Sequence, residues 1–213
     1  MRILKVEQLN ENKMWYKSIP EILNWLESKS NIPWLLIDTE TTGLKGPKNE
    51  QLTQISAVAM NYNFTSNTFK EIGTFDWIKT FSPSLLVAQN AGFDMNMLSG
   101  RSDRKIVDEV FDTKMLIQLY YLPLLQKLAE TDKKYKELIN FIGTSTRDNG
   151  LISSSMSKIG PATGVEMSGY HDALTDCRLM KEMYQKIVVL LKEHSDKDIS
   201  KYQAERIKSI RLK

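Results

Sequence analysis

The stretch that decides the fold reads Trp34-Leu35-Leu36-Ile37-Asp38-Thr39-Glu40-Thr41-Thr42-Gly43-Leu44. It opens with an apolar run directly after Pro33, which predicts a short strand buried on both faces. Asp38 and Glu40 stand where this strand ends, and the two-residue period of a strand points both carboxylates the same way. Such a pair is repulsive unless a cation lies between the carboxylates, and Mg²⁺ is a natural choice. The stretch therefore predicts a cation site at the end of a strand.

An acid-x-acid triplet is weak evidence for a site when it is taken alone. Asp196 and Asp198 have the same spacing in polar surroundings, where they are best interpreted as exposed surface. Asp38 and Glu40 differ because a buried strand precedes them and Thr-Thr-Gly follows as a tight turn that a ligand could approach. The alternative, that they are turn or cap acids, stays open from this stretch alone.

The rest of the chain predicts a mixed α/β sheet. Residues 51–62 alternate in part, and residues 68–80 are rich in Phe, Ile, Trp and Thr. With the first strand they predict three successive antiparallel strands, and residues 85–88 predict another buried strand. Strands early in the chain and helices later are typical of an α/β fold with a mixed sheet.

Helical patterns begin before the first strand and dominate after the strands. Ser18 and Glu21 form a capping-box pattern at the start of a helix that we expect to dock on the main domain. Asp112 is a candidate N-cap, and residues 143–169 are expected to be mostly loop with a short helix near Met156. The later helices are expected over residues 115–122, 124–141 and 173–193.

Composition and charge set broad limits. The 213 residues are enough for one domain, which we place at residues 34–193, between an extension (1–33) with one helix and a helical basic tail (194–213). The tail accounts for the whole net charge of +3, which suits a phosphate backbone and equally suits a solvated helix face.

The expected location is the cytoplasm, with no membrane association. Cys177 is the single cysteine, which excludes an intrachain disulfide and fits a reducing compartment. The sequence has no apolar stretch near the ~20 residues of a membrane span, and its first residues lack the apolar run of a secretory signal.

Two more segments carry candidate site residues. Asn90-Ala91-Gly92-Phe93-Asp94 follows a predicted strand and places Asp94 at the start of a helix, where it could also be a simple N-cap. His171 precedes the helix that carries Asp176, and Asp176 lies on the buried stripe of that helix. An imidazole beside a buried acid suits a general base, although a structural histidine would also fit this segment alone.

Together the three segments resemble the motifs of the DEDDh family of 3′-to-5′ exonucleases, in the same order, over residues 34–184. Asp172 stands where a related branch has tyrosine, so the resemblance is to the histidine branch. The chain departs from the usual family pattern at Cys177, where alanine is common, and at Gln89, where histidine often stands. The resemblance implies a ribonuclease-H-like fold, with a mixed five-stranded sheet flanked by helices.

The resemblance also implies roles for individual residues. Asp38, Glu40, Asp94 and Asp176 would bind two Mg²⁺ ions, with Mn²⁺ as an alternative, and His171 would activate water. Thr41, Leu44, Asn90 and Phe93 would contact the substrate, which is nucleic acid with a free 3′ end, expected to be single-stranded.

The expected activity is hydrolytic removal of nucleotides from the 3′ end of DNA. An exoribonuclease acting on RNA is the alternative, because the catalytic residues are shared and the choice depends on how the pocket treats a 2′-hydroxyl. An inactive nucleic-acid-binding module is a third reading, and the presence of all five expected catalytic side chains argues against it.

Overall fold

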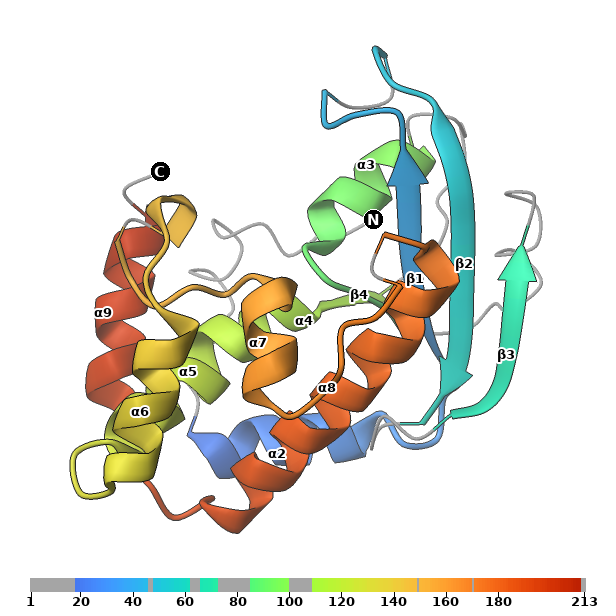
Figure 1. Ribbon diagram of the computed structural model, residues 1–213. Helices are drawn as coiled ribbons and strands as arrows, with labels where there is room; N and C mark the ends of the chain where they lie inside the picture. The colour runs from blue at the N-terminus through green and yellow to red at the C-terminus, as the bar shows by residue number, and fades with distance from the viewer. Residues whose placement is uncertain are drawn as a thin grey trace.

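The computed structural model describes residues 18–45, 48–61, 66–72, 85–99, 109–148, 150–169 and 171–211. Residues 1–17 of the predicted extension and residues 73–80 of the predicted third strand lie outside this part. In the described part, a mixed sheet lies beside a group of packed helices (Figure 1). The division into three segments along the chain stays a prediction.

The sheet has five strands in the spatial order β3-β2-β1-β4-β5. They are β1 (Trp34–Thr41), β2 (Leu52–Met60), β3 (Ser66–Ile72), β4 (Leu85–Ala88) and β5 (Glu109–Asp112). The first three form an antiparallel meander, whereas β4 pairs in parallel with β1 and β5 pairs in parallel with β4. The predicted α/β fold with a mixed sheet is therefore confirmed. The short β5 had no sequence prediction of its own, because two apolar residues are too few to show a period.

Strand β1 is buried on both faces, as predicted. Leu36 belongs to the larger apolar core, which includes the helix α8 (Ala173–Glu193). Leu35 and Ile37 belong to a second core on the other face, with the helix α3 (Ala91–Ser99). The strand continues to Thr41, so Asp38 and Glu40 are themselves strand residues and do not follow the end of the strand. Strict alternation therefore applies to these acids.

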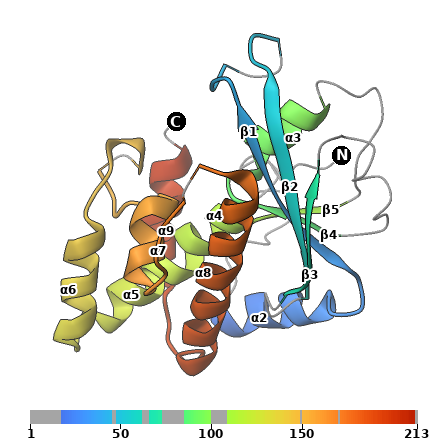
Figure 2. The same ribbon diagram turned by 45° about the vertical axis from the view of Figure 1, so that its right-hand side comes forward.

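Helices cover the two faces of the sheet unequally. The helices are α2 (Ile19–Ser28), α3 (Ala91–Ser99), α4 (Thr113–Leu116), the π-helix η2 (Ile117–Tyr121), α5 (Leu122–Leu128), α6 (Lys133–Ile142), the 3-10 turn η3 (Thr146–Asp148), α7 (Met156–Ala162), α8 (Ala173–Glu193) and α9 (Ser200–Arg211). The long α8 lies along β1 and β2 on one face, and α3 lies on the opposite face (Figure 2). No helix in the described ranges has the length and apolarity needed to cross a membrane.

Several helix predictions are confirmed and one is wrong. Helix α8 has the predicted bounds, α7 begins at Met156, and Ser18 at the start of α2 donates its N–H to Glu21 at 2.7 Å. The single helix predicted over 124–141 is instead α5 and α6, separated by a turn. Asp132 causes the break because its side chain accepts the N–H of Lys134 at 2.8 Å and caps α6.

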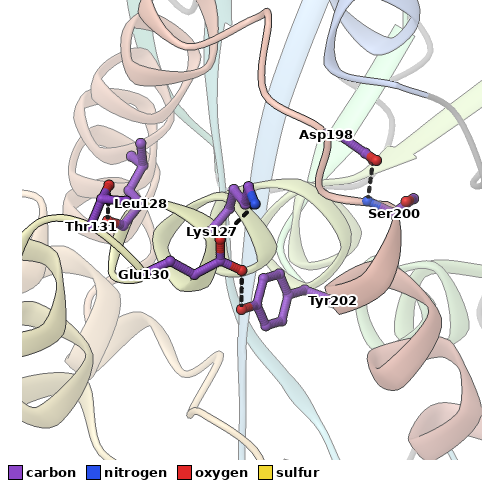
Figure 3. A network of polar contacts seen from close by, with 7 residues as sticks. All are labelled: Lys127, Leu128, Glu130, Thr131, Asp198, Ser200 and Tyr202. Carbon is purple, nitrogen blue, oxygen red and sulfur yellow. Dashed lines mark hydrogen bonds and ion pairs between the residues drawn. The ribbon is translucent and has the colours of Figure 1, made fainter.

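The C-terminal helix α9 is packed into the fold. The Tyr202 hydroxyl donates to Glu130 at 2.8 Å, and Lys127 of α5 pairs with the same carboxylate at 2.6 Å (Figure 3). Gln203 donates to the carbonyl of Leu119 at 2.8 Å in the interior. Arg206 is 2% exposed, so one of the basic groups of this segment is turned away from solvent.

Candidate active site

One side chain of β2, that of Gln54, links the end of β1 to the start of α8. Gln54 pairs in register with Glu40, and its amide donates to Asp172 at 2.9 Å and accepts the N–H of Ala173 at 3.1 Å. Asp172 caps α8 by accepting the N–H of Thr175 at 2.9 Å. The N-terminus of α8 is therefore fixed at the strand position next to Glu40.

Three of the predicted site residues come together at this junction. One ligand atom from each of Glu40, His171 and Asp176 lies within 4.8 Å of the others, which is a spacing that could hold a metal ion. Asp176 is buried and His171 is exposed. The backbone N–H of His171 donates to the Asp176 carboxylate at 3.3 Å. The main chain of His171 is thus hydrogen-bonded to Asp176, and the imidazole ring is accessible from solvent.

Asp38 adds a fourth group to the same place. It lines one pocket together with Asp176, on the α8 side of β1. The pKa of Asp38 is raised to about 9, first by burial and then by the neighbouring carboxylates of Asp94, Asp176 and Glu40. Crowded carboxylates of this kind fit a site for divalent cations, because a cation removes the repulsion between them.

Asp94 reaches this region from the opposite face of the sheet. It lies in the first turn of α3, is 3% exposed, and accepts a hydrogen bond from the Thr39 hydroxyl at 2.6 Å. Thr39 stands between the two acids of β1 and therefore points to the α3 face. Asp94 is outside the close group of Glu40, His171 and Asp176, although its charge raises the pKa of Asp38. The sequence analysis did not identify Thr39 as a site residue. Its position between Asp38 and Glu40 was the one feature of the sequence that could have indicated this role.

The raised pKa values predict a pH-dependent response to magnesium. Burial also raises the pKa of Asp94 to about 7 and that of Asp176 to about 6. The folded protein therefore holds protons that the unfolded chain releases near its ordinary pKa of 3.8, so without metal the free energy of unfolding falls as pH rises from 3.8 to about 9.

Bound Mg²⁺ requires the ionised carboxylates, so its stabilising effect should grow over the same range. We expect saturating Mg²⁺ to raise Tm more at about pH 8 than at about pH 5.5, measured against matched samples in EDTA. An equal shift of Tm at the two pH values would contradict the assignment of these acids to a metal site.

The predicted substrate contacts fall into two groups. Thr41 is half-buried, its hydroxyl donates to the Gly43 carbonyl at 2.6 Å, and Leu44 is 80% exposed. A Cβ at Gly43 would lie 2.6 Å from the Glu50 carboxylate, so any other residue at this position would require the flexible Glu50 side chain to shift. An apolar side chain as exposed as that of Leu44 is available to a ligand.

Asn90 and Phe93 lie at the start of α3. Phe93 is half-buried, and Asn90 is exposed, lines the pocket and donates its N–H to Asp112 at 3.0 Å. Asn90 and His171 are the two non-glycine residues of the described part with positive φ, at 60° and 80°. Strained backbone is concentrated at functional sites, and here it coincides with two residues that were selected from sequence alone.

The pocket has a volume of about 310 Å³ and extends from the acids to a wall that sequence reasoning did not identify. Its lining residues are Asp38, Gln89, Asn90, Lys114, Ser145, Asp148, Ser154, Ser155, Met156, Asp176 and Met180. Gln89, which departs from the family pattern, is held here by the hydroxyls of Tyr184 and Thr113. Cys177, the other departure, lies on α8 and is buried against β1 and β2, with its thiol near the carbonyls of Leu36 and Ser56.

No protein-family model and no curated protein sequence matches the chain. Solved structures do match it. A structure of E. coli exonuclease I in complex with a 5cy-dA13 oligonucleotide has a TM-score of 0.51 at 15% identity, over 76% of this chain and 42% of that one. A structure of the ExoI/SSB-Ct complex has a TM-score of 0.50 at 14% identity, over 78% of this chain and 43% of that one. Exonuclease I in complex with the inhibitor BCBP gives a TM-score of 0.50 at 13% identity, with the same coverage.

These likenesses confirm the resemblance predicted from the three motifs at the level of the fold. At such low identity they show the fold alone. The chain spans less than half the length of the exonuclease I chains that it matches.

Proposed function

We propose that this protein is a divalent-metal-dependent 3′-to-5′ exonuclease that removes nucleotides from the 3′ end of single-stranded DNA. The observation that carries the proposal is the convergence of Asp38, Glu40, Asp176 and His171 from two distant segments, with Asp94 close enough to raise the pKa of Asp38. Burying several carboxylates this close together costs free energy unless cations bind to them. Cytoplasmic location stays a prediction.

The residues of the site suit metal-assisted hydrolysis of a phosphodiester. Two bound Mg²⁺ or Mn²⁺ ions would supply charge stabilisation for the phosphoryl group and a nucleophilic water at neutral pH. Asp38, Glu40, Asp94 and Asp176 would hold them. The exposed ring of His171 would accept the proton of the attacking water, because its backbone bond to Asp176 keeps it at the edge of the acid cluster. Thr41, Leu44, Asn90 and Phe93 would position the terminal nucleotide.

The direct test uses matched single-stranded DNA and RNA oligonucleotides labelled at the 5′ end, with Mg²⁺ or with EDTA. We expect a ladder of products that shorten from the 3′ end, formed with Mg²⁺ and faster on DNA. Faster digestion of RNA would replace the DNA assignment with the exoribonuclease alternative. Binding of either strand without any Mg²⁺-dependent cleavage would leave only the inactive binding module.

Replacing His171 with alanine should lower kcat about 10²- to 10⁴-fold, because a positioned general base contributes on that order. The exposed ring contributes little packing, so Tm should stay near that of the wild type. His194→Ala is the matched control, because His194 contacts Tyr135 at 3.5 Å near the end of α8, away from the acids. Cleavage by the His171 variant at the rate of the control would remove His171 from the mechanism.

A further inference from the structure

We infer that Lys114 and the serine-rich wall of the pocket form a phosphate subsite, which holds a phosphodiester of the substrate strand beside the acidic cluster. The inference rests on the proposed function and adds a specific contact to it. Lys114 lies outside the three motifs, and its pattern in the sequence gives no sign of a binding role. Only the structure places Lys114 in the pocket.

The backbone of Lys114 is fixed by a carboxylate that also fixes Asn90. Asp112 accepts the N–H of Lys114 at 2.9 Å and the N–H of Asn90 at 3.0 Å. Both residues line the pocket that Asp38 and Asp176 share. A strand placed by Asn90 would therefore pass close to Lys114, whose backbone position relative to Asn90 is set by Asp112.

Lys114 is the positively charged residue among the described residues that line this pocket. Ser145, Ser154 and Ser155 also line the pocket. The Ser154 hydroxyl already donates to Asp148 at 2.9 Å, so Ser145 and Ser155 are the hydroxyls that we assign to the phosphate. A compact ammonium beside hydroxyl groups suits a phosphate group, and such contacts position a nucleic acid without reading its bases. The pocket volume of about 310 Å³ is at the small end of the range for ligand sites, which suits one extended strand.

Asp148 also lines the pocket, and its charge would oppose a phosphate if it were free. Its carboxylate accepts three hydrogen bonds from the protein: from the Ser154 N–H and hydroxyl, both at 2.9 Å, and from the Gln118 amide at 3.1 Å. The buried guanidinium of Arg206 is near enough to interact electrostatically with this carboxylate, and its opposite charge offsets part of the charge of Asp148. The Asp148 carboxylate is therefore held in the hydrogen-bond network of the wall with an opposite charge nearby, and Lys114 is the positive charge that lines the pocket.

The test compares wild type with Lys114→Gln and Lys114→Arg on a 5′-fluorescent single-stranded oligonucleotide. For Lys114→Gln we expect KM to rise about tenfold with kcat within about twofold, and the slope of log Kd against log salt to fall by about 0.7, the value for one phosphate of a single strand. Lys114→Arg should restore most of the affinity. Lys133→Ala is the matched control, because Lys133 is an exposed lysine of α6 paired with Glu137.

The outcomes separate this inference from the proposed function. Normal cleavage by the wild type, with KM and salt slope unchanged in Lys114→Gln, would overturn the subsite alone. A loss of kcat without a change in KM would also overturn it, because it would give Lys114 a role in the chemical step. A wild-type protein that neither binds nor cleaves the oligonucleotide would overturn the proposed function and the subsite together.

Discussion

Replacing Asp176 with asparagine is expected to lower kcat on the order of 10³-fold or more. Asp176 belongs both to the close group with Glu40 and His171 and to the pocket shared with Asp38. Asparagine keeps the shape of the side chain and removes the charge that a divalent cation requires. The measurement is single-turnover cleavage of a 5′-labelled oligonucleotide at saturating Mg²⁺.

The same substitution should not unfold the protein. Burial raises the pKa of Asp176 to about 6, so its ionised form is unfavourable in the absence of metal, and a neutral amide removes that cost. We expect Tm in EDTA at about pH 8 to equal or exceed that of the wild type. Asp196→Asn is the control, because Asp196 is an exposed acid outside the site that pairs with Lys197 on the surface. Retention of more than about a tenth of wild-type kcat would exclude Asp176 as a metal ligand.

Replacing Arg206 with alanine is expected to lower the free energy of unfolding by about 2–4 kcal/mol. The guanidinium of Arg206 donates to the carbonyl of Ile152 at 2.6 Å from a side chain that is 2% exposed. Alanine would leave a cavity and a buried carbonyl without its donor. Chemical denaturation monitored by tryptophan fluorescence measures the change.

Two further variants separate packing from charge at Arg206. Its Nε and Nη1 have no hydrogen-bond partner, and burial lowers its pKa to about 10, so the buried charge itself is costly. Arg206→Met keeps the volume and should recover most of the loss. Lys208→Ala, at an exposed position of the same helix, should change stability by less than about 0.5 kcal/mol. Arg206→Ala as mild as the Lys208 variant would show that α9 is not part of the core.

The sequence predicted those features of the site that depend on local pattern. Alternation in β1 directed Asp38 and Glu40 to one side, and the helical period of α8 directed Asp176 to the buried stripe. Each of these directions follows from the geometry of a single strand or helix, so the sequence of that one segment is enough to predict it. The bounds of α8 were predicted for the same reason, since its apolar stripe is long and unbroken.

Other features depend on pairs of residues far apart in the sequence. Gln54 is separated by 118 positions from the Asp172 side chain that it contacts, and Thr39 by 55 positions from Asp94. Neither pair leaves a periodic trace that a single sequence could show. The break between α5 and α6 was missed for a different reason, because the choice of Asp132 as an N-cap or as an interior helical residue depends on competing local hydrogen bonds.

The packing of α9 changes how charge in the C-terminal segment must be tested. Removing everything after Glu193 is the simplest test of whether basic residues there attract phosphates. It would also remove the buried Ile199, Gln203 and Arg206, and with Arg206 the donor that holds the chain at Ile152 beside the pocket wall. Weak binding by a shortened chain could then result from displacement of the pocket wall, and it would be mistaken for a loss of electrostatic attraction to phosphates. Neutralising exposed Lys201 and Lys208 one at a time would leave the interior intact and measure the surface charge alone.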